Sequence, residues 1–205
     1  GNKGQVWCLV EEDNQLFCGH NVGTYRIDGD KAELIVTVPG TWNIKPYIDN
    51  PNILLQGNYN GINILEKQNG KWVFRNKLEG FNISSKYFEL LNKNKIFVSH
   101  EYKGVFELDV DDELTNVRSF KKDSLMDKGF NSGLVTYNGK VVYTYEKGVF
   151  VYNENAGKFQ KDSVLSEIFL PGHYTSGKLI PDPFHNKLWG FSDKNLSYVS
   201  PGRLN

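Results

Sequence analysis

A motif that returns five times constrains this chain more than any other feature of its sequence. Glycine follows a short apolar run and a polar loop at Gly23, Gly61, Gly104 and Gly148, at intervals of 38, 43 and 44 residues, and Asn195 takes the corresponding place 47 residues further on. Four residues after each of these positions the chain is apolar, at Ile27, Leu65, Leu108, Tyr152 and Val199. An apolar column repeated in this way predicts one buried position repeated in space.

The motif predicts two strands joined by a tight loop, because glycine and asparagine tolerate the positive φ angles that such loops need. Each copy is flanked by two more strand-like segments. The preceding ones are 6–10, 45–48, 87–90, 134–137 and 178–180, and the following ones contain 34–36, 72–74, Val117 and Phe159. Pro46 and Pro181 fall in the first segment of their copies, which predicts an edge strand there. No stretch of ordinary helix length shows a 3.6-residue period.

Four short strands about every 43 residues are typical of a β-propeller blade, whereas a sandwich would not repeat one motif in phase. The predicted fold is therefore all-β, with about five four-stranded blade repeats near 5–40, 41–80, 81–126, 127–172 and 173–205. The last repeat is incomplete, since the sequence ends soon after its third strand. We expect an arc or fragment of a larger propeller, whose open blade edges favour a homo-oligomer.

Composition excludes several classes of function. Of the 205 residues, 24 are Lys or Arg and 24 are Asp or Glu, so the chain lacks the basic surface of a nucleic-acid or membrane-surface binder. Two cysteines rule out a disulfide scaffold or a cysteine-ligated zinc domain. No catalytic, cofactor or metal motif is present, so we expect no cofactor and no bound metal.

The repeats resemble a known family along the whole chain, and some segments carry the resemblance most clearly. The stretches 81–89 and 99–106, the pair Leu188-Trp189 and the run 16–19 resemble the regulator-propeller repeats of Bacteroidetes sensor proteins. These repeats form the extracytoplasmic halves of hybrid two-component systems and of related one-component regulators with a triple-tyrosine domain. The sequence departs from the pattern at Ser99 and Thr144, which replace its first glycine, and the fifth copy lacks the second.

The resemblance implies a periplasmic ligand-sensing domain, often for glycans, within a membrane-anchored parent protein that can carry a histidine kinase. No kinase, triple-tyrosine domain or DNA-binding segment is present in these 205 residues. The leading hypothesis is a non-catalytic sensing segment of a bacterial signal-transduction regulator, with a small molecule or oligosaccharide as its ligand. The alternatives are a propeller glycosidase or lyase and a protein–protein interaction scaffold.

Loops on one predicted face supply the candidate ligand-binding residues. The second-to-third-strand loops and the inter-blade segments share this face, and both carry aromatic side chains beside amides and carboxylates, a combination that suits a sugar. The candidates are His20, Trp42, Tyr59, His100, Glu101, Tyr102, Tyr145, Glu146 and Asp193. Tyr59, Tyr102 and Tyr145 recur at equivalent loop positions and are the preferred surface candidates.

A structural role competes with binding at these loops. Aromatic–polar pairs begin the later repeats at Trp42-Asn43, Phe81-Asn82, Phe130-Asn131 and Tyr174-Thr175. Their aromatic rings could pack between blades while the polar residues satisfy turn backbone groups.

Three carboxylates and two histidines also recur at loop positions. Glu101, Glu146 and Asp193 could perform glycoside chemistry, but exposed loop carboxylates are more commonly solvated. His20 and His100 lie in non-adjacent repeats with no evident third metal ligand.

The two cysteines lie on neighbouring strands of one predicted hairpin. A three-residue turn would place Cys8 opposite Cys18, whereas a two- or four-residue turn would offset them by one residue. Both a disulfide and two packed thiols therefore remain open.

Overall fold

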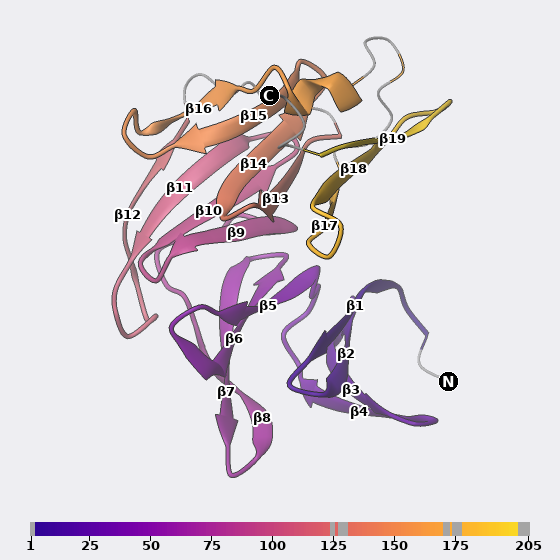
Figure 1. Cartoon of the computed structure of the whole chain (residues 1–205). Helices are drawn as coiled ribbons and strands as arrows, with labels where there is room; N and C mark the ends of the chain where they lie inside the picture. The colour runs from indigo at the N-terminus through magenta and orange to yellow at the C-terminus, as the bar shows by residue number, and fades with distance from the viewer. Residues whose placement is uncertain (1–2, 124–125, 127–130, 170–172, 174–177, 201–205) are drawn as a thin grey trace. The chain divides into compact units, whose positions relative to one another are not determined.

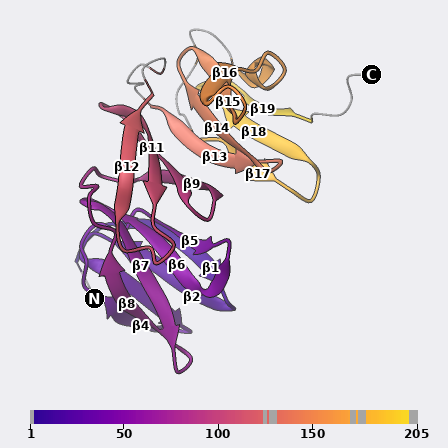
Figure 2. The same ribbon diagram turned by 90° about the vertical axis from the view of Figure 1, so that its left-hand side faces the viewer.

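The computed structural model describes residues 3–123, 126, 131–169, 173 and 178–200. All of the regular structure in this part of the chain is β, apart from one short 3₁₀ turn, η1 (Leu165–Ile168). The strands form five antiparallel sheets. Each sheet consists of consecutive strands of the chain, and each strand pairs with the next one (Figures 1 and 2). This is the predicted β-propeller fold.

Four of the sheets have four strands. They contain β1 (Val6–Glu12), β2 (Gln15–His20), β3 (Gly23–Asp28) and β4 (Lys31–Val36); β5 (Asn43–Tyr47), β6 (Asn50–Asn58), β7 (Gly61–Gln68) and β8 (Lys71–Lys77); β9 (Tyr87–Asn92), β10 (Lys95–His100), β11 (Gly104–Val110) and β12 (Val117–Lys122); and β13 (Gly133–Tyr137), β14 (Lys140–Tyr145), β15 (Gly148–Asn153) and β16 (Lys158–Lys161).

The fifth sheet is described only as far as its third strand, where the last predicted repeat also stops. Within the described residues it has three strands, β17 (Ile180–Asp182), β18 (Lys187–Phe191) and β19 (Leu196–Val199). Pro46 lies in β5 and Pro181 in β17, and both strands are edge strands of their sheets, as predicted. Each of these positions suits a residue that cannot donate a backbone hydrogen bond.

The chain forms two compact units. The N-terminal unit comprises Gly1–Tyr87, Asn92–Lys95 and Leu108–Phe120, and the C-terminal unit comprises Phe88–Leu91, Ile96–Glu107 and Lys121–Asn205. The third sheet contributes strand segments to both units.

In the N-terminal unit the first two sheets pack face to face. Phe17 and Val36 of the first sheet contact Ile44, Leu54, Leu65 and Trp72 of the second, all at most 4% exposed. The predicted buried column is confirmed at Leu65, whereas Ile27 is half-buried. Ile27 pairs with Leu16, whose neighbour Phe17 faces the second sheet. Because successive side chains of a strand point to opposite faces, Ile27 and Leu16 lie on the face of the first sheet that points away from the second sheet.

In the C-terminal unit the same type of contact recurs. Tyr137, Val142 and Val149 of the fourth sheet form a core with Leu188 and Val199 of the fifth, closed by the two apolar residues of η1. Phe97 of β10 packs on Tyr152 of β15, with ring centroids 4.5 Å apart. Consecutive sheets therefore bury one another's apolar faces, which no single sheet can do alone.

The repeat glycines serve two purposes. Gly61 has φ +112°, which confirms the predicted positive φ. A Cβ at Gly61 would also lie 2.4 Å from the carbonyl oxygen of Phe81, so the following inter-blade segment approaches the turn too closely for any side chain.

The register of the β1–β2 hairpin shows whether Cys8 and Cys18 can form a disulfide. Asp13 and Asn14 form a two-residue turn with positive φ at both positions, and Glu12 pairs with Gln15. Cys8 therefore pairs with Gly19 and Cys18 with Leu9, which places the thiols on opposite faces of the sheet, and both are free.

Candidate functional site

Three aromatic rings of the N-terminal unit meet where the first two sheets adjoin. Trp7 lies in β1, Trp42 just before β5, and Tyr59 in the turn between β6 and β7. The ring centroids of Trp7 and Trp42 are 4.4 Å apart, and those of Trp42 and Tyr59 are 5.3 Å apart with an edge-to-face arrangement. The Trp7 indole N–H donates to the Tyr59 hydroxyl at 3.2 Å. We call Trp7, Trp42 and Tyr59 the aromatic cluster.

The cluster is partly accessible and has polar neighbours. Tyr59 is 36% exposed, and both tryptophans are half-buried. The Trp42 indole N–H donates to the Ser84 hydroxyl at 3.1 Å. The exposed Lys86 ammonium lies over the Trp42 ring, 5.3 Å from its centroid, and a side chain of this kind can move aside for a ligand.

Backbone hydrogen bonds place the cluster residues. The Trp42 N–H donates to the Gly57 carbonyl at 2.8 Å, and the Thr41 N–H donates to the His20 carbonyl at 3.1 Å. The segment before β5 is thereby tied to the second strands of both neighbouring sheets. Trp7 was not among the sequence-based candidates, because a tryptophan in a first strand has no distinctive local pattern.

The His20 carbonyl contacts the segment that leads to Trp42, but the His20 ring is not presented to solvent. It is 4% exposed, its ring stands edge-to-face with Tyr25, and its Nδ1 accepts from the Val22 N–H at 3.3 Å. These contacts give it a role in its own turn.

In the C-terminal unit, the last residue of β10 and the turn after it supply three candidates. Tyr102 is 63% exposed, while half-buried His100 accepts from the Tyr102 N–H at 3.2 Å through Nδ1. Burial lowers the pKa of His100, and nearby Lys103 lowers it further. The Glu101 carboxylate accepts from the Asn131 N–H at 3.2 Å, so it holds the next inter-blade segment.

The remaining candidates of this unit are placed differently. Tyr145, expected at the surface, is only 3% exposed because it is the last residue of β14 and packs on Tyr143 and Phe150. Glu146 is exposed in the turn that follows. Asp193 is also exposed and pairs with Nδ1 of His173 at 3.1 Å.

The aromatic–polar pairs at the starts of the repeats divide between the two interpretations. Phe81 is 1% exposed and packs on Phe120, which agrees with a structural role for its ring, whereas Asn82 accepts from the Lys77 side chain rather than from a turn backbone group. Trp42 instead joins the partly exposed cluster, although Asn43 accepts from the next backbone N–H at 2.9 Å. Phe130, Tyr174 and Thr175 lie outside the described residues.

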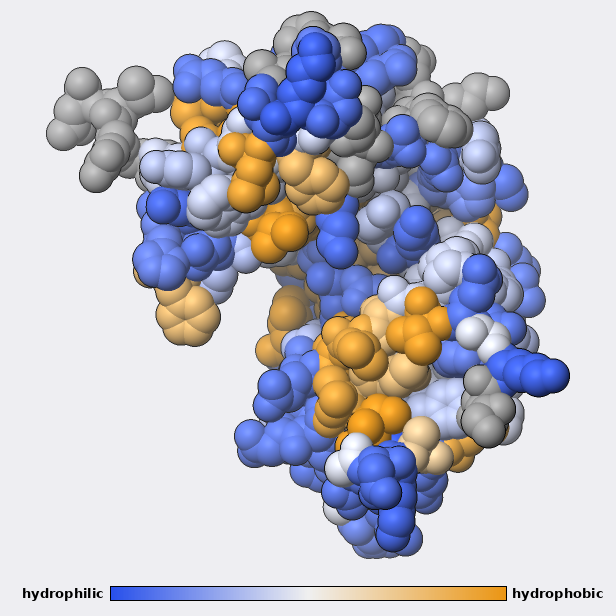
Figure 3. All heavy atoms as spheres, turned by 90° about the vertical axis from the view of Figure 1, so that its right-hand side faces the viewer, coloured by the Kyte–Doolittle hydropathy of each residue, from blue (hydrophilic) through white to orange (hydrophobic). Residues whose placement is uncertain are grey.

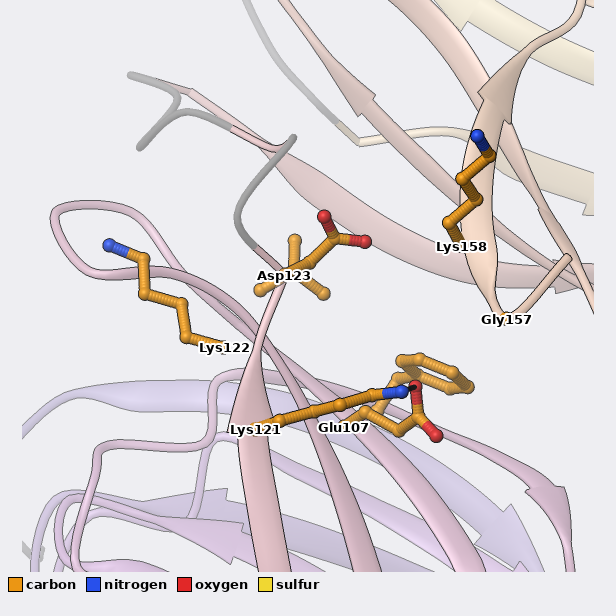
Figure 4. A pocket seen from close by; sticks show the side chains of 8 residues that line it. Glu107, Lys121, Lys122, Asp123, Gly157 and Lys158 are labelled. Atoms are coloured by element: carbon orange, nitrogen blue, oxygen red, sulfur yellow. Dashed lines mark ion pairs between the residues drawn. The ribbon is translucent and has the colours of Figure 1, made fainter.

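A cavity of about 180 Å³ lies in the C-terminal unit beside β12 and the start of β16 (Figure 4). Lys121 reaches the 5%-exposed Glu107, with 3.1 Å between nitrogen and oxygen, and the Tyr152 hydroxyl donates to the same carboxylate at 3.1 Å. Lys122 extends away from that pair (Figure 4). The cavity is smaller than the several hundred Å³ typical of ligand sites, and its central carboxylate is already engaged.

Two absences hold for the described part of the chain. Its His, Cys, Asp and Glu side chains form no group of three or more that could hold a metal ion. Its helical residues form no segment long and apolar enough to cross a membrane.

Solved structures of similar fold include sensor domains. The extracellular domain of the hybrid two-component system BT4673 from B. thetaiotaomicron matches over 98% of this chain with TM-score 0.66 and 17% identity, and that of BT3049 from the same organism over 98% with TM-score 0.64 and 15% identity. The WD40 β-propeller domain of Doa1 matches over 97% with TM-score 0.62 and 13% identity. At such identities the likeness shows the fold alone.

This chain spans 27% and 28% of the two B. thetaiotaomicron chains and 64% of the Doa1 chain. No protein-family model matches the sequence, and no curated protein is similar to it.

Proposed function

We propose that this chain is part of a larger propeller in the extracytoplasmic, membrane-anchored sensor of a bacterial signal-transduction regulator. We further propose that it binds an oligosaccharide through the aromatic cluster, without catalysis. The fold likeness to extracellular domains of two-component systems supports the class of protein. The sequence resemblance to regulator-propeller repeats points to the same class.

The observation that carries the ligand proposal is the contact of Trp42 with Tyr59 at the loop end of the second sheet. Aromatic faces stack on the apolar faces of sugar rings, and the Tyr59 and Ser84 hydroxyls and the Lys86 ammonium offer hydrogen bonds to sugar hydroxyls. The cluster draws on three separate segments of the chain. This arrangement suits binding of a sugar by stacking and hydrogen bonds rather than cleavage of a glycosidic bond.

The test is titration of the chain with cellohexaose, mannohexaose, xylohexaose and hexagalacturonate. Binding is measured by tryptophan fluorescence and by calorimetry. Tyr59→Ala should weaken binding of the preferred sugar at least about tenfold, since stacked aromatics dominate such contacts. Tyr198→Ala is the matched control, because Tyr198 is 52% exposed on β19 and lies outside the cluster. Failure of the wild-type chain to bind any of these sugars, or equal effects of the two variants, would contradict the proposal. Release of new reducing ends would favour a glycosidase instead.

A second candidate function, protein interaction, is favoured by the outer face of the first sheet. Leu9 and Leu16 are 64% and 37% exposed there, and Figure 3 shows apolar side chains gathered over this sheet. Their counterparts in the second sheet, Ile44 and Leu54, are at most 2% exposed because they pack on the first sheet. We propose that a second copy of this chain covers this face, and sedimentation should then show a dimer that Leu9→Glu dissociates. A monomeric wild-type chain would reject this candidate.

A further inference from the structure

Asn58 joins the segments that build the aromatic cluster. It is the last residue of β6, directly before Tyr59, and is completely buried. Buried amides are retained only where their polar atoms find partners, because an unpaired one is costly. The partners of Asn58 therefore show what its side chain does.

The Asn58 side chain holds the segment that leads to Trp42. Its Nδ2 lies 3.2 Å from the Pro39 carbonyl oxygen, 3.4 Å from that of Val38 and 3.1 Å from the Thr41 hydroxyl. Its Oδ1 accepts from the Asn63 amide at 3.0 Å, which fixes the orientation of the Asn58 amide.

This contact extends into a buried polar network between the first two sheets. Thr41 and Thr24 share a hydrogen bond of 2.9 Å, and the Thr24 hydroxyl donates to the Gln56 side chain at 2.8 Å. Thr24, Thr41 and Gln56 are 0% exposed. The network therefore cannot exchange its partners for water without opening the sheet interface.

The Asn58 backbone holds the next inter-blade segment. Its carbonyl accepts from the Ser85 N–H at 3.0 Å. Ser84, the hydrogen-bond partner of the Trp42 indole, precedes Ser85, and Lys86, which lies over the same indole, follows it. One residue thus holds both segments that flank the cluster and carries Tyr59 as its neighbour.

The corresponding position differs in the other sheets. The last residues of the five second strands are His20, Asn58, His100, Tyr145 and Phe191. Asn58 is the only amide among them. An aromatic or imidazole side chain cannot donate two hydrogen bonds from a single nitrogen, as the Asn58 amide does.

We propose that Asn58 is a positioning residue that holds Trp42, Tyr59 and Lys86 in the arrangement that binds ligand. The inference deepens the function proposed above and rests on it for the ligand. The positioning itself can be measured without ligand. The indoles of Trp7 and Trp42 have centroids 4.4 Å apart, so their electronic transitions couple and give a pair of circular-dichroism bands of opposite sign, the indole couplet.

The experiment compares Asn58→Leu and Thr41→Val with wild type. Asn58→Leu keeps the approximate volume and removes the amide, while Thr41→Val removes one hydroxyl and is the variant to rely on if the first fails to fold. Both variants should reduce the indole couplet of the ligand-free protein. Each substitution removes more than one buried hydrogen bond, so binding of the preferred hexasaccharide should also weaken at least about fivefold.

Ser99→Ala is the matched control. Ser99 is 1% exposed and shares a hydrogen bond of 3.3 Å with Ser132 in the C-terminal unit, whereas the aromatic cluster belongs to the N-terminal unit. It should lower the unfolding temperature and leave the couplet and the affinity unchanged.

The outcomes separate the two proposals. Folded Asn58→Leu or Thr41→Val protein with the full wild-type couplet would overturn the positioning role and leave the ligand proposal standing. If the couplet falls in both variants while the wild-type chain binds none of the four hexasaccharides, the positioning role is supported and the ligand proposal fails.

Discussion

Gly40 lies directly against the ring of Tyr59. A Cβ at Gly40 would be 2.2 Å from the Cγ and Cδ1 atoms of that ring, and the backbone there has φ +73°. The segment entering the second sheet and the turn of its central hairpin are therefore in van der Waals contact, although 19 residues separate them in sequence. Only glycine permits both the backbone angle and the approach.

Gly40→Ala should destabilise the chain more than Gly70→Ala. Gly70 has nearly the same angle, φ +77°, but nothing within 4 Å of its Cβ position. Both variants should lose about 1 kcal/mol of unfolding free energy to backbone strain, and Gly40→Ala about 1–3 kcal/mol more to the clash. Urea denaturation measures the difference, and equal losses would show that Tyr59 moves freely away from Gly40.

Asp111 should make stability sensitive to acid. Burial by itself would raise the pKa of its carboxyl, but hydrogen bonds from the side chains and backbone N–H groups of Thr115 and Asn116 outweigh it and hold the pKa at about 2. The pKa of Asp111 in the folded chain lies below its value in the unfolded chain. The ionised carboxylate therefore contributes fully to the free energy of unfolding above about pH 4, and this contribution is lost as the pH falls towards about 2.

Asp111→Asn should remove part of this acid dependence and lower stability at neutral pH by about 1–3 kcal/mol. Asp30→Asn is the control, because Asp30 is exposed in the turn between β3 and β4. Urea midpoints between about pH 2 and 7 measure the effect. An Asp111→Asn profile parallel to wild type would contradict the assignment.

Lys121→Met should destabilise the chain, whereas Lys122→Met should not. Lys121 pairs with Glu107, whose side chain is 6% exposed, while Lys122 points away from that carboxylate (Figure 4). Lys121→Met should lower the free energy of unfolding by on the order of 1 kcal/mol, since the hydrogen bond from Tyr152 to Glu107 remains and limits the effect. Lys122→Met should lower it by less than about 0.5 kcal/mol. Thermal unfolding distinguishes them, and the opposite order would mean that the ion pair contributes nothing.

The cysteines should stay reduced and react slowly. Burial raises the pKa of the Cys8 thiol to about 11, with a further rise from neighbouring Cys18, so little thiolate exists at pH 8. Iodoacetamide should label Cys8 in the native chain far more slowly than in urea. Mass spectrometry after oxidative purification should find both thiols, and a Cys8–Cys18 disulfide would mean that the first hairpin has another register.

Much of the fold could be predicted because its determinants are local. The repeat glycines mark tight turns, and the alternating apolar residues mark strands that bury one face. Both signals depend on near neighbours in sequence. The half-burial of Ile27 could not be predicted, since its local pattern equals that of fully buried Leu65.

The candidate site was less predictable. Trp42 and Tyr59 were expected from their loop positions, but the part played by Trp7 depends on the pairing of separate segments. Tyr145 shared its loop context with Tyr59 and yet is buried, because it is the last residue of β14 rather than a turn residue. A shift of one position along a hairpin reverses the direction of a side chain.

The sequence by itself determined the architecture and the strand order within each sheet, since hairpins and their turns involve residues close along the chain. Tertiary structure alone decided which aromatic residues meet and which candidates stay accessible. The physical reason is that a buried amide such as Asn58 selects partners from segments some twenty residues away. Such long-range pairing leaves no periodic trace in the sequence.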